Sequence, residues 1–299
     1  MTITILAARQ GSFHKERKIT VFTNLSNSAK ASVFYVFAFG LTLTASLLSP
    51  FLGELTMLIH MYTPTIATLL MLLVVTRDGY SKTGWATLGM HRAGLRFWAL
   101  ALVGPLVVWG AVYGLVWSTS VADAIMPAGF MLAIFALDVA TGLGISSAFA
   151  LGEEIGFRGY LLPRLMHLGT ARALLLSGML HGLWHFPLML LTPFYPIQGS
   201  WFIIGPIILL TLTAAGVFYG YLQLTSKSVW PATLAHGALN VYRNVFAMFT
   251  VAASPLALEY LAGETGILSF AATALCAGVI LYRLRQRRRT LAVQLPASM

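Results

Sequence analysis

Long apolar stretches constrain the fold of this chain more than any other feature of its sequence. A helix that crosses a bilayer needs about 20 apolar residues, and about eight stretches of that length follow one another along the chain. Their approximate ranges are 32–52, 55–76, 97–117, 130–152, 173–191, 201–224, 231–251 and 266–282. We therefore expect an all-α protein, a polytopic membrane helix bundle of about eight transmembrane helices.

The composition favours a single membrane-embedded domain over residues 32–282. Of the 299 residues, 58% are hydrophobic and only 9% are charged, whereas a soluble domain carries roughly 25% charged residues. A net charge of +10 could indicate a nucleic-acid partner, but the basic residues lie in short loops and tails without interleaved aromatic residues. We expect membrane lipid around this domain and no nucleic acid.

The distribution of charge predicts how the spans are oriented. Lysines and arginines gather in alternate loops and at both ends, where we expect a basic N-terminal arm at 1–31 and a basic tail at 283–299. Because basic loops stay in the cytoplasm, both termini are predicted to be cytoplasmic, and 77–96 is predicted to lie along the cytoplasmic membrane surface. The other loops contain no lysine or arginine, and their acidic residues are Glu54, Asp123, Glu259 and Glu264.

Two adjacent glutamates, Glu153 and Glu154, open the run EEIGFRGY near the cytoplasmic end of the fourth predicted span. On a helix, Glu154 and Arg158 are i,i+4 neighbours that can pair, whereas Glu153 points about 100° away. An ionised group at membrane depth costs about 2.5–3.5 kcal/mol, so such groups indicate chemistry or transport. We expect Glu153 to be a general base and Glu154 to be the structural partner of Arg158. The alternative is a helix end at the lipid–water interface, where these residues cost little.

Two further polar clusters lie in later predicted spans. In HGLWH, His181 and His185 are one helical turn apart, a spacing that suits a metal or hydrogen bonds between helices. In HGALN, His236 and Asn240 have the same spacing and form a polar seam that faces protein or a cavity rather than lipid. Each cluster alone is explained by polar contacts between helices. Together with Glu153 they indicate water activation and oxyanion stabilisation.

The three motifs resemble those of the CPBP family of intramembrane proteases. This family includes the type II CAAX-prenyl endopeptidases, the Abi proteins and bacteriocin-processing enzymes. EEIGFR resembles the family's EExxxR motif, HGLWH occupies the place of its FxxxH motif, and HGALN resembles its HxxxN motif. The resemblance covers roughly residues 130–250.

The resemblance implies a role for each motif. It implies that Glu153 is the base and that His185 helps it to hold and polarise the attacking water. It implies that His236 and Asn240 stabilise the oxyanion. It also implies that Glu154 and Arg158 support the glutamate site.

His181 departs from the family pattern, which has an aromatic or aliphatic residue at this position. At a metal-free site, His181 is expected to replace a packing residue. At a metal site, it is expected to join Glu153 and His185 as a zinc-binding set. The cofactor is therefore open, and metal-free activation is slightly favoured over a divalent metal such as zinc.

The expected function is that of an intramembrane endopeptidase acting on a peptide or protein substrate, with C-terminal and lipidated substrates included. We expect a multi-pass protein of a bacterial plasma membrane whose active site opens to the cytoplasm. One alternative is a non-catalytic immunity or scaffold protein of the same fold. A less favoured alternative is a transporter with a relay through Glu153, Asp138 and Arg243, although the inverted repeats of many transporters are not seen.

Overall fold

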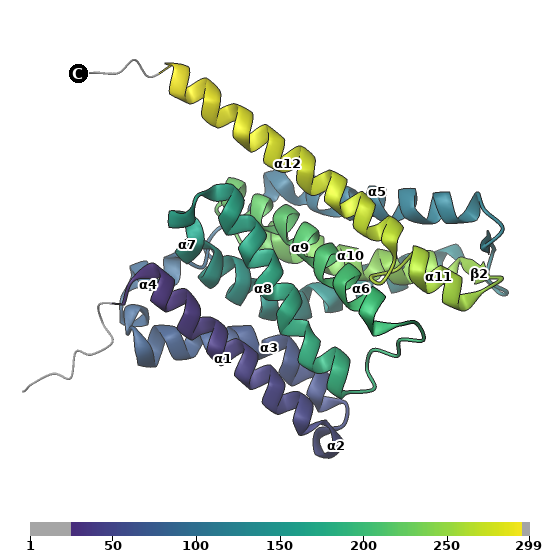
Figure 1. Ribbon diagram of the computed structural model, residues 1–299, viewed down its shortest axis with the longest axis horizontal. Helices are drawn as coiled ribbons and strands as arrows, with labels where there is room; N and C mark the ends of the chain where they lie inside the picture. The colour runs from purple at the N-terminus through teal and green to yellow at the C-terminus, as the bar shows by residue number, and fades with distance from the viewer. Residues whose placement is uncertain (1–24, 295–299) are drawn as a thin grey trace, which may run out of the picture.

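A computed structural model of the chain describes residues 25–294 (Figure 1). Most of the predicted arm at 1–31 and the last part of the predicted tail, 295–299, lie outside the described residues. The described chain folds almost entirely into packed helices. The expectation of an all-α polytopic bundle is confirmed.

Long helices form the body of the bundle, and short helical turns and two short strands connect them. The long helices are α1 (Asn27–Leu47), α3 (Leu55–Leu70), α5 (Trp98–Trp117), α6 (Leu132–Glu154), α8 (Thr170–Leu191), α9 (Trp201–Ser226), α10 (Trp230–Met248) and α12 (Ile267–Gln294). The short elements are α2 (Ser49–Leu52), η1 (Met71–Val75), η2 (Asp78–Tyr80), α4 (Lys82–Ala86), η3 (Leu95–Phe97), β1 (Ala122–Ala124), η4 (Ile155–Leu161), α7 (Leu162–Leu165), η5 (Met166–Leu168), β2 (Thr250–Ala252) and α11 (Pro255–Leu261).

Within residues 25–294, seven helical segments are long and apolar enough to cross a membrane. They are Asn27–Leu47, Leu55–Val75, Leu95–Trp117, Leu132–Leu168, Thr170–Leu191, Trp201–Ser226 and Ile267–Arg287. The remaining predicted span, 231–251, corresponds to α10, which is helical but is not one of these seven. Its stripe of polar residues lowers its hydropathy, and α10 packs against α5, α6 and α9 inside the bundle. The polar seam predicted on this helix therefore faces protein.

The helices pack in an order that places α6, α8, α9 and α10 in the middle. Figure 1 shows these four helices between α1 and α3 on one side and α5 and α12 on the other. Contacts between α8 and α9, and between α10 and α6, are among the most extensive in the bundle. Of these four helices, α8, α9 and α10 bury residues along most of their length, whereas the buried residues of α6 lie only at its end, between Ala150 and Glu154.

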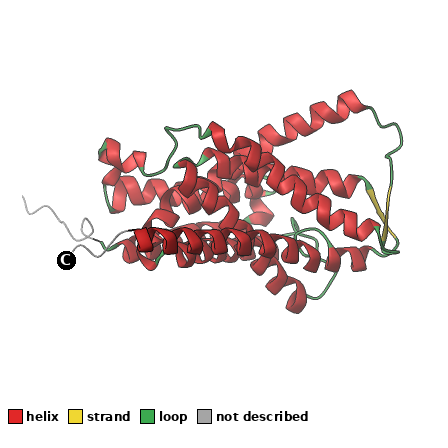
Figure 2. Cartoon of the chain, turned by 90° about the horizontal axis from the view of Figure 1, so that it is seen from above, coloured by secondary structure: helices red, strands yellow, loops and turns green. Residues whose placement is uncertain are grey.

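Three local features differ from the sequence predictions. An antiparallel pair, β1 and β2, which an all-α prediction does not include, lies at one end of the bundle (Figure 2), with Ala122 opposite Ala252. The predicted span 231–251 therefore overruns its helix into β2. The last predicted span, 266–282, is shorter than its helix, because α12 continues without a break to Gln294.

The loop predicted to lie along the membrane surface, 77–96, is tied to the turn between α9 and α10. The Val229 amide donates to the Gly89 carbonyl at 3.3 Å, and Trp230 Nε1 donates to the Met90 carbonyl at 3.0 Å. These bonds fix the loop against the start of α10, the helix that carries the HGALN motif.

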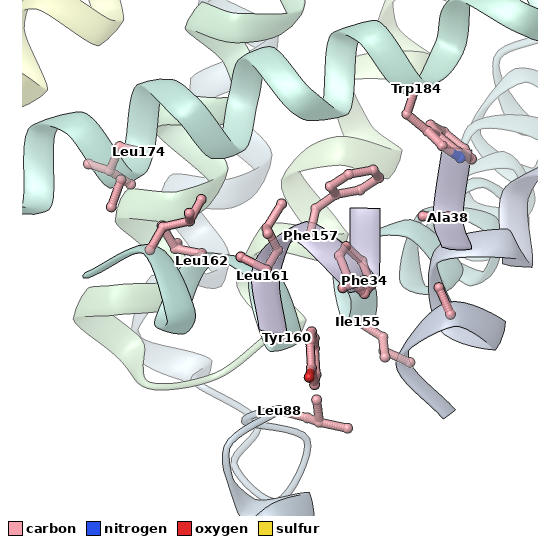
Figure 3. Packing of buried hydrophobic residues seen from close by; sticks show 14 of the residues in the cluster. Phe34, Ala38, Leu88, Ile155, Phe157, Tyr160, Leu161, Leu162, Leu174 and Trp184 are labelled. Atoms are coloured by element: carbon pink, nitrogen blue, oxygen red, sulfur yellow. The ribbon is translucent and has the colours of Figure 1, made fainter. Parts of the chain in front are cut away.

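The apolar core next to the EEIGFRGY segment is aromatic. The ring of Phe34 from α1 contacts the rings of Phe157 and Tyr160 at centroid distances of 6.1 and 5.1 Å (Figure 3). All three side chains are completely buried. Aromatic contacts of this kind add about 0.5–1.5 kcal/mol each beyond the area that they bury. The packing of these three rings therefore anchors the EEIGFRGY segment against α1.

A crossing of two glycines brings α8 and α9 close together. A Cβ atom added at Gly216 would lie 2.5 Å from the Cα of Gly178 and 2.9 Å from Arg158 Nη2. Any side chain at this crossing would force the helices apart. Gly216 thus lets α9 reach the guanidinium of Arg158.

Gly216→Ala is expected to destabilise the protein by about 1–3 kcal/mol, the usual cost of overpacking. Gly278→Ala in α12 is the matched control, because a Cβ there would meet nothing within 4 Å. Thermal unfolding of both purified variants in one detergent measures the difference. Equal melting temperatures for the two variants would contradict the close crossing.

Candidate active site

The two glutamates and Arg158 lie at the junction of α6 and η4. Glu153 and Glu154 are the last residues of α6, and Arg158 lies in η4, where the helix widens into a π-helical turn. Glu153 is 1% exposed, and Glu154 and Arg158 are 0% exposed. Single π-helical turns inside α-helices are frequent at functional sites. The alternative of an exposed interfacial helix end does not fit this burial.

Glu154 and Arg158 form the ion pair that their spacing predicted. Arg158 Nη1 donates to Glu154 Oε1 at 3.0 Å. The same carboxylate oxygen lies 2.9 Å from His236 Nδ1 on α10. Glu154 therefore joins the first motif to the third.

The second motif reaches the first through His181. His181 Nε2 lies 2.6 Å from Glu153 Oε2, and Arg158 Nη1 donates to His181 Nδ1 at 2.7 Å. His185, one turn further along α8, has its Nε2 at 3.9 Å from the same Glu153 oxygen. The imidazole in hydrogen-bond contact with Glu153 is thus the one that departs from the family motif.

These contacts form a continuous chain of buried polar groups. It runs from Glu153 through His181, Arg158 and Glu154 to His236. A buried charge is tolerated when it is paired and hydrogen-bonded. The residues predicted from three separate motifs therefore stabilise one another in a single cluster.

Asn240 lies one turn beyond His236 on α10 and is half-buried. The i,i+4 spacing keeps its amide on the same face of α10 as the imidazole. Its predicted role as an oxyanion donor stays a prediction.

Aromatic and imidazole rings from helices without a motif complete the site. Tyr219 of α9 stacks on His236 with centroids 5.1 Å apart, and His60 of α3 stacks on Trp184 at 3.9 Å. The His60 ring is also 5.7 Å from that of His185. Neither residue was selected from the sequence. The one available signal was a lone histidine inside an apolar span, which marks His60 but not Tyr219.

The transporter relay is not assembled in the described structure. Arg243 forms an ion pair with Glu264, which lies before α12. Asp138 is exposed and lies on α6 about four turns before Glu153, roughly 22 Å along the helix axis. Neither residue contacts the buried cluster.

Glu153, His181 and His185 form a candidate set of metal-binding side chains within residues 25–294. One donor atom from each lies within 4.8 Å of the others. Whether these atoms can hold zinc depends on which ring nitrogens carry protons.

Comparison with known proteins identifies the segment that holds the cluster. Residues 135–242 match the family model described as type II CAAX prenyl endopeptidase Rce1-like. This segment contains all three motifs, and the match confirms the predicted resemblance to the CAAX proteases. No curated protein matches the chain.

Arg158→Ala is expected to destabilise the protein by about 3–5 kcal/mol, because it leaves Glu154 buried without its partner. The double variant Arg158→Ala/Glu154→Gln should recover part of this loss, since it removes the uncompensated charge. Arg172→Ala, at an exposed position of α8, is the control and should behave like the wild type. Unfolding measured in detergent tests all three, and an Arg158→Ala variant as stable as the control would contradict the structural role of the pair.

Proposed function

We propose that this membrane protein, whose residues 135–242 match the Rce1-like family of type II CAAX prenyl endopeptidases, is an intramembrane endopeptidase that uses a glutamate-activated water. The observation that carries the proposal is the contact of a fully buried glutamate with two histidines beside a second, histidine-bound glutamate. A carboxylate and imidazoles in this arrangement are the groups that general-base hydrolysis requires.

Glu153 and His185 offer the attacking water two acceptors. Within the described chain, Glu153 Oε2 contacts the two histidines, which leaves Oε1 for the water. His185 Nδ1 lies 3.1 Å from the carbonyl oxygen of His181, which can only accept, so Nδ1 carries the proton. His185 Nε2 then has a free lone pair. The water donates one hydrogen to each acceptor, and Glu153 takes the proton as oxygen attacks the peptide carbonyl.

His236 and Asn240 stabilise the oxyanion that forms. Glu154 occupies His236 Nδ1, so His236 can donate to the oxyanion only from a protonated Nε2. A ring that donates from both nitrogens is an imidazolium, and the Glu154 carboxylate supplies its counter-charge. The Asn240 amide is the second donor. Each donor aimed at an oxyanion contributes about 3–4 kcal/mol to transition-state stabilisation.

The proposed substrate is a protein or peptide that reaches the site from the cytoplasm. The name of the matched family specifies prenylated CAAX substrates, so lipidated C-terminal peptides are the first class to test. The charge distribution of the loops supports access from the cytoplasm. A bacterial plasma membrane is the proposed location, in keeping with the short loops of the chain.

Glu153→Gln should lower the cleavage rate by about 10²–10⁴-fold, the contribution of a positioned general base, because an amide cannot take the proton. The assay uses reconstituted protein and a library of C-terminal peptides with and without a prenyl group, with products identified by mass spectrometry. Glu54→Gln, at an exposed position, is the control and should retain full activity. Full activity in Glu153→Gln would exclude the mechanism. No cleavage by the wild type would instead favour the immunity or scaffold alternative.

The orientation of the protein across the membrane is tested by labelling with a membrane-impermeant maleimide. Cys276, the single cysteine, is first replaced by serine. Tyr80→Cys and Phe51→Cys place thiols at positions that are 77% and 87% exposed, the first in the 77–96 loop and the second at the predicted outer end of the first span. In intact cells we expect labelling at position 51 and, only after lysis, at position 80. The reverse pattern would overturn the cytoplasmic placement of the site.

A further inference from the structure

We propose that His181 is a positioning residue that holds the Glu153 carboxylate through its Nε2 proton, and that it is not a zinc ligand. This inference rests on the proposed function, since it assigns a role within the same reaction. The family pattern does not supply it, because that pattern has no histidine at this position.

The contact with Arg158 decides where His181 carries its proton. A guanidinium has five N–H donors and no acceptor, so His181 Nδ1 must accept at the 2.7 Å contact. A neutral imidazole with an unprotonated Nδ1 carries its proton on Nε2. His181 therefore donates from Nε2 to Glu153 Oε2 at 2.6 Å. A doubly protonated ring would set two N–H groups against each other at the Arg158 contact.

The same contact makes the cluster a poor fit for zinc. A zinc-binding histidine coordinates with an unprotonated nitrogen and donates its other N–H to an acceptor. For Nε2 of His181 to coordinate, the proton would have to sit on Nδ1, facing the donors of Arg158. The tautomer inferred from the Arg158 contact has the lone pair on Nδ1 and the proton on Nε2, the reverse of what zinc binding needs.

The distances agree with a hydrogen bond and not with shared coordination. Tetrahedral zinc with bonds of about 2.0–2.1 Å holds its ligand atoms about 3.3 Å apart. The distance from Glu153 Oε2 to His181 Nε2 is 2.6 Å, and that to His185 Nε2 is 3.9 Å. One separation is too short for two ligands of one ion, and the other is too long. Zinc binding would require the Glu153 carboxylate or the two rings to move.

The surroundings of His181 hold its ring in place. Phe157 stacks on it with centroids 4.4 Å apart and an angle of 25° between the rings. Arg158, fixed by Glu154, restrains the edge of the ring opposite Glu153. His181 is therefore hydrogen-bonded through both ring nitrogens in addition to packing against Phe157. The ion pair of Glu154 and Arg158 holds the His181 ring, and the ring in turn holds the Glu153 carboxylate in place.

Three substitutions separate the two hydrogen bonds of His181. Gln can place an N–H near the Nε2 position and keeps the donor to Glu153. Asn reaches only the Nδ1 position and keeps an acceptor for Arg158. Phe keeps the ring and removes both bonds.

Positioning of the base predicts that His181→Phe and His181→Asn lower kcat by roughly 10–100-fold, the effect of a misplaced reacting group, with KM little changed. His181→Gln should stay within a few-fold of the wild type. A purely structural role predicts instead that Asn, which keeps the Arg158 contact, is the best replacement. His91→Phe, which removes an exposed imidazole outside the buried cluster, is the control and should leave kcat within a few-fold.

Two further measurements do not depend on turnover. Nitrogen NMR of histidine-labelled protein in micelles should show an Nε2-protonated His181, assigned by its absence from the His181→Gln spectrum. Purified wild type should lack stoichiometric zinc and should keep its activity in a chelator. An Nδ1-protonated His181, or zinc at one equivalent that all three His181 variants lose, would overturn the inference. So would a His181→Phe variant with the kcat of the wild type.

The outcomes also separate this inference from the proposed function. If the proposed function is wrong, the wild type is inactive or the Glu153→Gln variant is active. In either case the NMR tautomer and the zinc content still decide the role of His181.

Discussion

The ion pair between Glu154 and Arg158 is the interaction on which the rest of the site depends. Both side chains are 0% exposed, and a buried pair that loses one member leaves a charge that the protein interior cannot solvate. Arg158 uses the same nitrogen to contact His181, and Glu154 uses the same oxygen to contact His236. The pair therefore fixes one histidine from α8 and one from α10.

Close packing makes this arrangement possible. The glycine crossing of Gly178 and Gly216 lets α9 approach Arg158, and Tyr219 from α9 covers the His236 ring. If His236 carries two protons as the proposal requires, then Glu153 and Glu154 are balanced by Arg158 and His236. A cluster without net charge is the form that a low-dielectric interior tolerates best.

The prediction of the fold from sequence was successful for the helices that hydropathy alone identifies. Seven apolar segments were found because a spanning helix needs a continuous apolar stretch. α10 was predicted from the same rule at 231–251 but owes its place to protein neighbours on several sides, which let it carry polar residues. The β1–β2 pair was not predicted, since two strands of three residues from distant loops leave no periodic signal.

The sequence by itself determined the pairing of Glu154 with Arg158 and predicted that Glu153, His185, His236 and Asn240 belong to one site. Spacing along a helix is local, so i,i+4 neighbours can be identified without a tertiary structure. Only the tertiary structure decided that His181 is the nearer imidazole to Glu153, that His60 and Tyr219 join the site, and that Arg243 pairs with Glu264 instead. These contacts depend on the rotation and separation of packed helices, which are set by side-chain packing between residues far apart in the chain.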